Sequence, residues 1–415
     1  MAMIIKRDYY LQQLISSKSN NLIKIVTGIR RSGKSFLLFN LFHNHLIETG
    51  ISEDHIIEIA LDDRLNKNLR DPDVILQYIH ERIVDDKLYY IILDEVQMID
   101  EFTDVLNSLL HIRNADVYVT GSNSKFLSKD VVTEFRGRGD EIHLFPLSFA
   151  ELYNSIGGDK FELWKSYYTY GGLPGILELD SEKKKAAYLR SLHETVYLKD
   201  IIERNNLKNS EEFMELMRVM ASCIGSPCNP SKLENTFKSV KNETLDRKTI
   251  SKYLSYMEDA FLIEKSMRYD IKGRKYIGTL SKYYFQDIGL RNALLNFRQV
   301  EENHIMENVI YNELRLRGFC VDVGMVEART AKERKQLEVD FVANMADRRY
   351  YIQSAFAMPD DDKREQESAS LKRIDDSFKK IIIMRDDIKP YHDNNGFYIV
   401  GLMDFLLKPD LIEQL

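Results

Sequence analysis

The chain has 415 residues, which is enough for roughly two or three domains with hydrophobic cores of their own. Its 58 basic and 65 acidic residues give a net charge of -7, so the molecule is not a polycation of the histone kind, and any surface for nucleic acid must be a local patch. Three cysteines exclude a disulfide framework. Because there is no run of about 18 apolar residues and no signal-peptide pattern, we expect a cytoplasmic protein without membrane contact.

The first motif along the chain is a phosphate-binding loop at residues 28–35. The segment GIRRSGKS fits the pattern G-x-x-x-x-G-K-[ST], with an apolar strand before it and an apolar helix after it. The two glycines let the backbone approach an anion closely, and the helix N-terminus adds positive potential. We expect Lys34 at the β- and γ-phosphates of a nucleotide and the Ser35 hydroxyl as a ligand of Mg²⁺. The predicted phosphate-binding residues are Gly28, Ile29, Arg30, Arg31, Ser32, Gly33, Lys34, Ser35 and Phe36.

The first 150 residues alternate short apolar strands with longer amphipathic stretches, one of which is a predicted helix at 73–84. This alternation predicts a parallel sheet covered by helices, the α/β class of a P-loop NTPase core. We expect the core at residues 1–150 and a helical lid at 151–210, interrupted by a loop at 171–175. The predicted strands of the core are residues 22–27, 56–61, 88–93, 116–120 and 141–145.

Two acids follow the third predicted strand directly. The apolar segment YYIIL at 89–93 is followed by Asp94 and Glu95. The carboxyl ends of parallel strands face the ligand crevice in sheets of this class. We therefore expect Asp94 to hold Mg²⁺, directly or through water, and Glu95 to polarise the attacking water. The pair turns a predicted nucleotide pocket into a predicted hydrolysis site.

Polar residues also follow the next strand, which ends at Thr120. Asn123 is the expected contact to the γ-phosphate and the attacking water, although an ordinary Gly-Ser-Asn turn explains the same residues. Arg136 and Arg138 precede the last strand of the core. Arginines at this place either act as fingers across a subunit interface, with Arg138 as the first candidate, or are surface residues. The finger interpretation implies a homo-oligomer.

Together these segments resemble the AAA-type ATPase domain of a bacterial and archaeal family that carries a C-terminal DUF4143 domain. The resemblance covers nearly the whole chain. It implies ATP as the nucleotide, Mg²⁺ as the cofactor and an AAA+ core, and it implies no particular client. It rests on residues 28–35, 94–95, 120–123 and 136–138, on PLSFAE at 146–151, GGLP at 171–174, YLKD at 197–200 and KYYFQD at 282–287.

Residues 211–280 have short helices followed by a predicted hairpin around Gly273, an order that suggests a winged helix. Basic residues gather on the last helix and in the hairpin turn, among them Lys248, Lys252, Lys272 and Arg274. A winged helix places one helix in the major groove and basic side chains on phosphates, so double-stranded DNA is one candidate partner. A module for protein contacts explains the same pattern.

Residues 281–415 are similar in layout to PD-(D/E)xK nucleases. Glu307 on a predicted helix at 303–317 and Asp340 near a strand correspond to acids that hold a divalent metal. Gln353 stands where the next strand requires an acid, and Ala355 where it requires a lysine. We therefore expect a nuclease-like α/β domain that has lost its chemistry. Its predicted strands lie near residues 319–327, 337–343, 349–356, 380–384 and 397–400.

The function predicted from the sequence is Mg²⁺-dependent ATP hydrolysis that moves the winged-helix and C-terminal regions, with action on DNA left open. Nucleotide drives such motion only through contacts that differ between the two states. The alternative is a nucleotide-dependent switch or scaffold that acts on protein partners, without DNA binding and with negligible turnover.

Overall fold

The computed structural model describes residues 5–121, 137–241, 245–329 and 334–414, and it divides into two compact units. Unit 1 contains Met1–Leu147 and two short segments, Leu173–Glu178 and Asp259–Phe261. Unit 2 contains Ser148–Gly172, Leu179–Glu258 and Leu262–Leu415. Neither unit is one continuous stretch of sequence, because the chain passes from one to the other more than once.

A five-stranded parallel sheet with the strand order β2-β3-β4-β1-β5 forms the centre of unit 1. The five predicted strands are confirmed, with ends shifted by one or two residues. Val26 pairs with Thr120 and Leu93 with Val119, so β1, β4 and β3 end at the same edge of the sheet. The strands are β1 (Ile23–Thr27), β2 (Ile56–Ala60), β3 (Tyr89–Asp94), β4 (Ala115–Thr120) and β5 (Gly139–His143).

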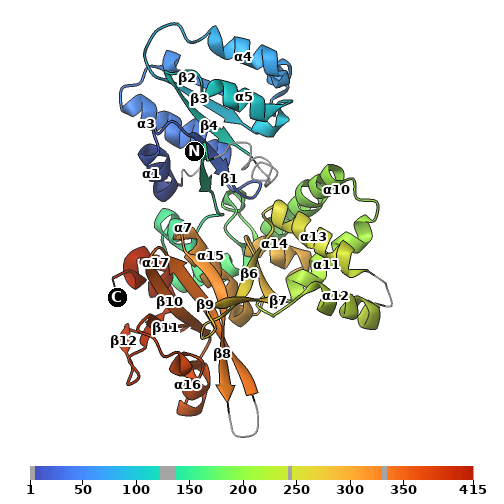
Figure 1. Cartoon of the computed structure of the whole chain (residues 1–415), viewed down its shortest axis with the longest axis vertical. Coiled ribbons are helices and arrows are strands. Elements are labelled where there is room, and N and C mark those ends of the chain that lie inside the picture. Colours follow the sequence, from blue (N-terminus) through green and yellow to red (C-terminus); the bar gives the residue numbers. More distant parts are fainter. Residues whose placement is uncertain (1–4, 122–136, 242–244, 330–333, 415) are drawn as a thin grey trace. The chain divides into compact units, whose positions relative to one another are not determined.

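Helices cover both faces of this sheet (Figure 1). α4 (Pro72–His80) and α5 (Phe102–Leu109) pack on the face that contains Ile91, while α1 (Asp8–Ser16) and α3 (His43–Glu48) pack on the face that contains Ile92. Both faces are therefore buried, which explains why the strands are continuous apolar runs. The predicted helix at 73–84 ends earlier, at His80, and turns follow it. The helix after the phosphate-binding loop begins as α2 (Lys34–Phe36) and continues through a π-helical turn, Leu37–Phe42, into α3.

Unit 2 contains an eight-stranded mixed sheet with the order β12-β13-β11-β10-β9-β8-β6-β7. The predicted hairpin around Gly273 is β6–β7, and β6 also pairs in parallel with β8 through residues 268–270 and 323–325. The hairpin therefore belongs to the same sheet as the C-terminal strands, and the boundary expected at residue 281 falls inside β7. The strands are β6 (Ile263–Asp270), β7 (Lys275–Phe285), β8 (Cys320–Arg329), β9 (Arg334–Met345), β10 (Arg348–Ala355), β11 (Lys379–Met384), β12 (Tyr391–His392) and β13 (Tyr398–Gly401).

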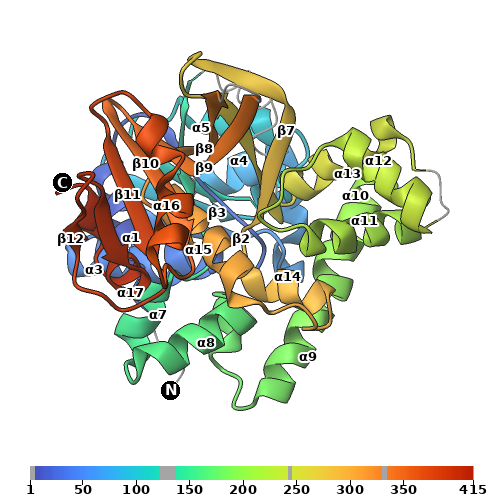
Figure 2. The same cartoon turned by 90° about the horizontal axis from the view of Figure 1, so that it is seen from below.

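The helices of unit 2 surround this sheet. α15 packs on one of its faces, in a large hydrophobic cluster, through Ile305, Val309 and Leu314. α11, α12 and α13 lie beside β7 at one edge, as Figures 1 and 2 both show. The helices are α7 (Phe149–Ile156), α8 (Lys160–Tyr170), α9 (Glu182–Leu192), α10 (Lys199–Asn205), α11 (Ser210–Ser222), α12 (Pro230–Thr236), α13 (Arg247–Asp259), α14 (Ile288–Leu294), α15 (Glu302–Leu316), α16 (Asp361–Ser368) and α17 (Leu402–Leu407).

Two motifs that are far apart in the sequence meet within unit 2. The carboxylate of Asp287 accepts a hydrogen bond from the amide of Gly172 (2.8 Å). Gly171 has a φ of +76°, and a Cβ there would lie 2.5 Å from the same carboxylate. The loop after α8 therefore requires glycine for close approach to Asp287. The following residues, 173–178, belong to unit 1.

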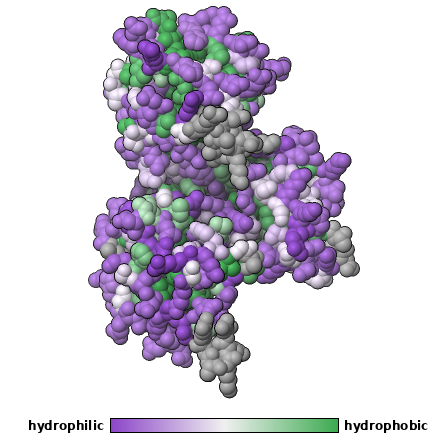
Figure 3. All heavy atoms as spheres, in the orientation of Figure 1, coloured by the Kyte–Doolittle hydropathy of each residue, from purple (hydrophilic) through white to green (hydrophobic). Residues whose placement is uncertain are grey.

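The surface in view in Figure 3 is mainly hydrophilic, with smaller hydrophobic areas between the hydrophilic ones. Among the described residues, no helix has the length and apolar composition that crossing a membrane requires.

Candidate nucleotide-binding site

The loop between β1 and α2 has a backbone conformation that the two glycines of the motif permit. Gly28 has a φ of +136° and Gly33 a φ of +100°, both in the region that side chains disfavour. A Cβ at Gly28 would lie 2.2 Å from the carbonyl oxygen of Leu144, so a larger residue requires a backbone shift. Arg31, between the two glycines, also has a positive φ of 66°. The chain thus bends sharply between the end of β1 and the helix.

Lys34 is the first residue of α2, and its side chain is buried. Its Nζ donates hydrogen bonds to the carbonyl oxygens of Gly28 (3.0 Å) and Ile29 (3.1 Å). Burial lowers the pKa of Lys34 to about 8, and the negative charges of Glu95 and Asp94 oppose this shift. The ammonium therefore lies inside the loop, where the phosphate oxygens of a ligand would compete with the two carbonyl groups.

Ser35 meets Asp94 at the end of β3. Asp94 is buried, with 4% of its surface exposed, and its carboxylate accepts hydrogen bonds from the hydroxyls of Thr120 and Ser35. Burial raises the pKa of Asp94, and these two hydrogen bonds act in the opposite direction. A hydroxyl and a carboxylate side by side are oxygen ligands of the kind that Mg²⁺ binds. In the described part of the chain, no group of three His, Cys, Asp or Glu side chains is arranged to hold a metal ion.

Glu95 follows in a left-handed backbone conformation with a φ of 53°. Its amide donates to the Thr120 hydroxyl (3.0 Å), and its carboxylate accepts a hydrogen bond from the side-chain amide of Gln97. Its charge acts on Lys34 more strongly than that of Asp94. The structure therefore brings Lys34, Ser35, Asp94 and Glu95 together at one edge of the sheet.

Thr120 is a site residue that the sequence did not single out. It is the last residue of β4, is fully buried, and contacts both acids of β3. The expected contact residue, Asn123, lies outside the described residues, as does Arg136. Arg138 is exposed just before β5, and its carbonyl oxygen accepts a hydrogen bond from the amide of Ile23 (2.9 Å). The only sequence signal for Thr120 is a polar residue at the end of an apolar strand.

Arg7 and Ser32 make further contributions to the structure of the phosphate-binding loop. Arg7 is buried and donates hydrogen bonds to the carbonyl oxygens of Ser32 (3.3 Å) and Phe145 (2.7 Å), so it fixes the loop to the end of the sheet. The Ser32 hydroxyl is buried and has no hydrogen-bond partner among the described residues. A buried hydroxyl without a partner is uncommon in proteins and fits a loop that receives an acceptor such as a phosphate oxygen. Of the other predicted contacts, Arg31 and Phe36 are exposed.

A second cluster of charged residues lies in unit 2, around Lys282. The ammonium of this buried lysine is 2.8 Å from Glu307 Oε1, 2.7 Å from Glu338 Oε1 and 3.9 Å from Asp340 Oδ1. Tyr284 also donates to Glu307 (2.7 Å). Burial and the charge of Glu307 raise the pKa of Asp340 to about 8, while Lys282 opposes the shift. Glu307 and Asp340, the two acids expected to hold a metal, thus lie beside a lysine that was not part of the predicted nuclease-like site.

The two positions that depart from the nuclease pattern lie on β10. Gln353 is half-buried, and its Oε1 has no hydrogen-bond partner among the described residues. Ala355 is buried at the end of the strand. The neighbouring amide of Ser354 donates to Asp340 (2.8 Å), which ties this strand to the cluster around Lys282.

Two known families match the sequence. Residues 20–153 match the family described as an AAA domain, which covers the phosphate-binding loop and all five strands of the unit 1 sheet. Residues 161–301 match a domain of unknown function, DUF8612. The prediction of a DUF4143 domain is therefore wrong. The short segments GGLP and KYYFQD, on which that expectation depended, lie within the range that matches DUF8612.

A relative similar over the full length is an uncharacterized protein of Haemophilus influenzae. It is 33% identical over 414 residues, which make up 98% of this chain and 99% of the relative. The chain belongs to the family of this protein. An uncharacterized protein of Methanocaldococcus jannaschii is also similar, with 29% identity over 393 residues, 90% of this chain and 82% of that protein. Both similarities extend over the region that matches the AAA domain and over the region that follows it.

Among solved structures, the ORC1 protein of Aeropyrum pernix in complex with DNA is 12% identical. The match covers 71% of this chain and 93% of that chain, with a TM-score of 0.30. This likeness is too weak to support an inference about function.

Proposed function

We propose that the protein binds and hydrolyses ATP with Mg²⁺ in unit 1. The observation that carries this proposal is the meeting of Lys34 and Ser35 from the loop with Asp94 and Glu95 from β3 in one partly buried group. The match of residues 20–153 to the AAA domain family supports it. Phosphoryl transfer requires little beyond positioning and charge stabilisation, and these residue types supply both.

Each of these residues has a task in the proposed reaction. Lys34 exchanges its two carbonyl acceptors for phosphate oxygens and balances part of their charge. Ser35 and Asp94 would hold Mg²⁺, which, when bound, neutralises charge that develops on the phosphates. Glu95, held by Gln97, orients and polarises the attacking water. Thr120 fixes the Asp94 carboxylate relative to the backbone of Glu95, because its hydroxyl donates a hydrogen bond to Asp94 and accepts one from the Glu95 amide.

The test of this function is the binding of Mg²⁺ and ATP to the full chain, measured by isothermal titration calorimetry. Lys34→Ala should weaken binding by at least about tenfold, because it removes a charge-assisted contact to the phosphates. The matched control is Lys67→Ala, which removes an exposed lysine elsewhere in unit 1. Equal affinity in the wild type and Lys34→Ala would contradict the proposal.

Nucleotide state would reach unit 2 through the chain at residues 171–178. Gly172 is held by Asp287 within unit 2, whereas the next residues belong to unit 1. There, Pro174 Cγ is 3.9 Å from the position that a Cβ on Gly33 would occupy. A change in the phosphate-binding loop would therefore act on a segment whose preceding residue is fixed in unit 2. Such coupling requires contacts that differ between nucleotide states.

A second candidate function is action on double-stranded DNA through a winged helix. Its support is the order of α11, α12, α13 and the β6–β7 hairpin, with a short antiparallel bridge from Cys228 to Ser281. Lys248 and Lys252 are exposed on α13. Other basic residues are partly neutralised, since Glu234 lies 3.0 Å from Lys238 and 3.8 Å from Arg247. The alternative remains a nucleotide-dependent switch that acts on protein partners.

The rate of ATP hydrolysis with and without double-stranded DNA separates these two candidates. Action on DNA predicts a rate that changes with DNA, and a salt-dependent affinity that falls when Lys248 and Lys252 are both replaced by Gln. Action on protein partners predicts a slow rate that DNA leaves unchanged.

We also propose that the nuclease-like region cuts no nucleic acid. Lys282 lies among the acids that would otherwise attract a divalent metal, and its buried ammonium already balances two of them. Gln353 and Ala355 replace two further groups that the reaction requires. Supercoiled plasmid incubated with the protein and Mn²⁺ should stay intact, and cleavage that Asp340→Asn abolishes would contradict this proposal.

A further inference from the structure

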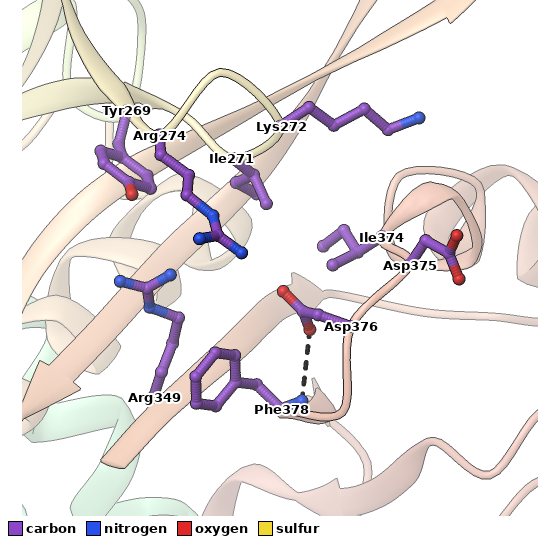
Figure 4. A pocket seen from close by; sticks show the side chains of 9 residues that line it. All are labelled: Tyr269, Ile271, Lys272, Arg274, Arg349, Ile374, Asp375, Asp376 and Phe378. Atoms are coloured by element: carbon purple, nitrogen blue, oxygen red, sulfur yellow. Dashed lines mark hydrogen bonds between the residues drawn. The ribbon is translucent and has the colours of Figure 1, made fainter. Parts of the chain in front are cut away.

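A pocket of about 600 Å³ lies in unit 2, on the turn between β6 and β7 and the loop before β11 (Figure 4). Its size is within the range of small-molecule sites in proteins. Side chains alternate along β10, so Tyr351 belongs to the cluster beneath this pocket, whereas Tyr350 belongs to the cluster packed on α15. Glu307 of the cluster around Lys282 is itself on α15. The pocket is therefore on the other face of the sheet from the nuclease-like cluster.

The floor of the pocket is apolar. Ile271 and Ile374 line it, and both are buried in the hydrophobic cluster below. Gly324 on β8 makes this possible, because a Cβ there would lie 2.9 Å from Ile271 Cδ1. The absence of a side chain at Gly324 leaves room for Ile271 beneath the pocket. An apolar floor of this kind accommodates a planar ring.

Arg349 is a fixed positive charge in the wall. Its Nε donates to Asn344 (2.7 Å), and its guanidinium lies 5.5 Å from the ring centre of Tyr269 and 5.2 Å from that of Phe378. These distances are those of cation–π contacts, which hold a guanidinium in place. Planar guanidinium groups fixed in this way are surfaces on which nucleobases stack.

Arg274 supplies a second guanidinium, which faces the same space as that of Arg349 (Figure 4). It is exposed, and within the described residues its side chain has no hydrogen bond or salt bridge. The turn that presents it is well defined, because Asp270 accepts a hydrogen bond from the amide of Gly273 (2.9 Å). Lys272 lies on the rim of the same pocket. The exposed guanidinium of Arg274, with a lysine on the same turn, favours a phosphate group.

Asp376 supplies a hydrogen-bond acceptor. Its carboxylate accepts hydrogen bonds from the Tyr351 hydroxyl (2.7 Å) and from the amide of Phe378 (3.2 Å). These two bonds leave lone pairs on the carboxylate for a further donor. In Figure 4 the carboxylate of Asp376 points into the pocket, towards Arg274. A ligand group that donates a hydrogen bond, such as an amino group on a ring, fits this position.

We propose that this pocket binds a nucleoside monophosphate unit whose base carries an amino group, either free or at the 5′ end of a single strand. The phosphate lies between Arg274 and Lys272, the base lies over Ile271 and Ile374 beside Arg349, and its amino group donates to Asp376. This site is separate from the phosphate-binding loop and does not depend on ATP hydrolysis.

The test uses AMP and a 3′-fluorescein-labelled, 5′-phosphorylated tetradeoxyadenylate with the full chain. AMP should displace the labelled strand, and Arg274→Gln should weaken both ligands by about tenfold, as expected for loss of charge-assisted hydrogen bonds to a phosphate. The matched control is Lys275→Gln, which removes the same charge from the neighbouring exposed residue outside the pocket. If the strand binds at least about tenfold more tightly than AMP, the natural ligand is a strand end, and equal affinities indicate a free nucleotide.

Asp376→Asn tests the base contact. The wild type should prefer AMP to inosine monophosphate, which has a carbonyl in place of the amino group, and the variant should lose this preference. The same titrations with Lys34→Ala show which site binds. Loss of AMP binding in Lys34→Ala together with unchanged binding in Arg274→Gln would overturn the proposal. So would inorganic phosphate that competes as well as AMP, or an acidic peptide that binds where AMP does not.

Discussion

At the scale of single residues, the proposed nucleotide site contains a group that lowers the stability of the fold. Lys34 is buried with its charge, and its pKa is lowered to about 8 because burial disfavours the ammonium. The two carbonyl groups of the loop are its hydrogen-bond acceptors without a ligand. A phosphate would bind the same ammonium more strongly than a carbonyl does. Lys34, on which the proposed function depends most, therefore lowers the stability of the protein when no ligand is bound.

We predict that Lys34→Met stabilises the nucleotide-free protein by about 1–3 kcal/mol at neutral pH, because it removes a buried charge and leaves an apolar chain of similar length. Urea unfolding followed by circular dichroism would measure this, with Lys67→Met as the control for an exposed lysine. A variant less stable than the wild type would show that Lys34 is structural and that its contacts outweigh its burial.

His193 provides a second prediction, on pH. It is buried in unit 2, and burial, with the charge of Arg218, lowers its pKa to about 4. The unfolded chain takes up a proton at this histidine below about pH 6.5, while the folded chain does so only near pH 4, so stability is lost as the pH falls through this range. The expected loss from pH 6.5 to pH 5 is about 2 kcal/mol.

In the variant His193→Gln this part of the acid sensitivity should disappear, whereas replacement of the exposed His80 by Gln should leave it. Urea unfolding at several pH values measures the slope. An identical slope in His193→Gln and the wild type would contradict the assignment.

At the scale of elements, strand order decides which residues meet. β4 lies between β3 and β1, so Thr120 at its end reaches the acids at the end of β3. The sequence predicted the five strands, because each is a short apolar run between polar segments. It could not predict Thr120 as a site residue, because the order of parallel strands is not encoded in their separate patterns. Asp94 and Glu95 were predictable because a strand end and its acids are adjacent in the sequence.

Pairing between distant segments also explains which contacts of unit 2 could not be predicted from the sequence. Lys282 is one residue of an ordinary strand in the sequence, and only the fold of unit 2 brings its side chain to Glu307 on α15 and to Glu338 and Asp340 on β9. The hairpin around Gly273 was predictable from its turn, whereas its pairing with β8 links segments about fifty residues apart. The prediction of a separate module at residues 211–280 therefore missed that its hairpin is part of the eight-stranded sheet of unit 2.

We predict that Lys282→Met destabilises the protein by about 3–5 kcal/mol at pH 7, because it leaves one buried and two partly buried acids without a counter-charge. Urea unfolding at pH 7 measures it, with Lys265→Met, on the exposed side of β6, as the control. A change below about 1 kcal/mol would show that the lysine is not needed to balance the cluster.

At the scale of the whole molecule, the chain combines an AAA domain with a larger unit whose own family is of unknown function. The proposed hydrolysis site is in the first, and the pocket with Arg274 and Arg349 is in the second. In the proposed reaction Glu95 polarises the attacking water, while Lys34 and Ser35 bind the nucleotide.

Phosphate release by Glu95→Gln tests the role of Glu95, because Gln keeps the size of the side chain and removes its basicity. We predict that the variant binds Mg²⁺ and ATP with the affinity of the wild type and releases phosphate at least about a hundredfold more slowly, as loss of a positioned base requires. The exposed neighbour variant Glu101→Gln should keep the wild-type rate. Wild-type phosphate release by Glu95→Gln would contradict the account.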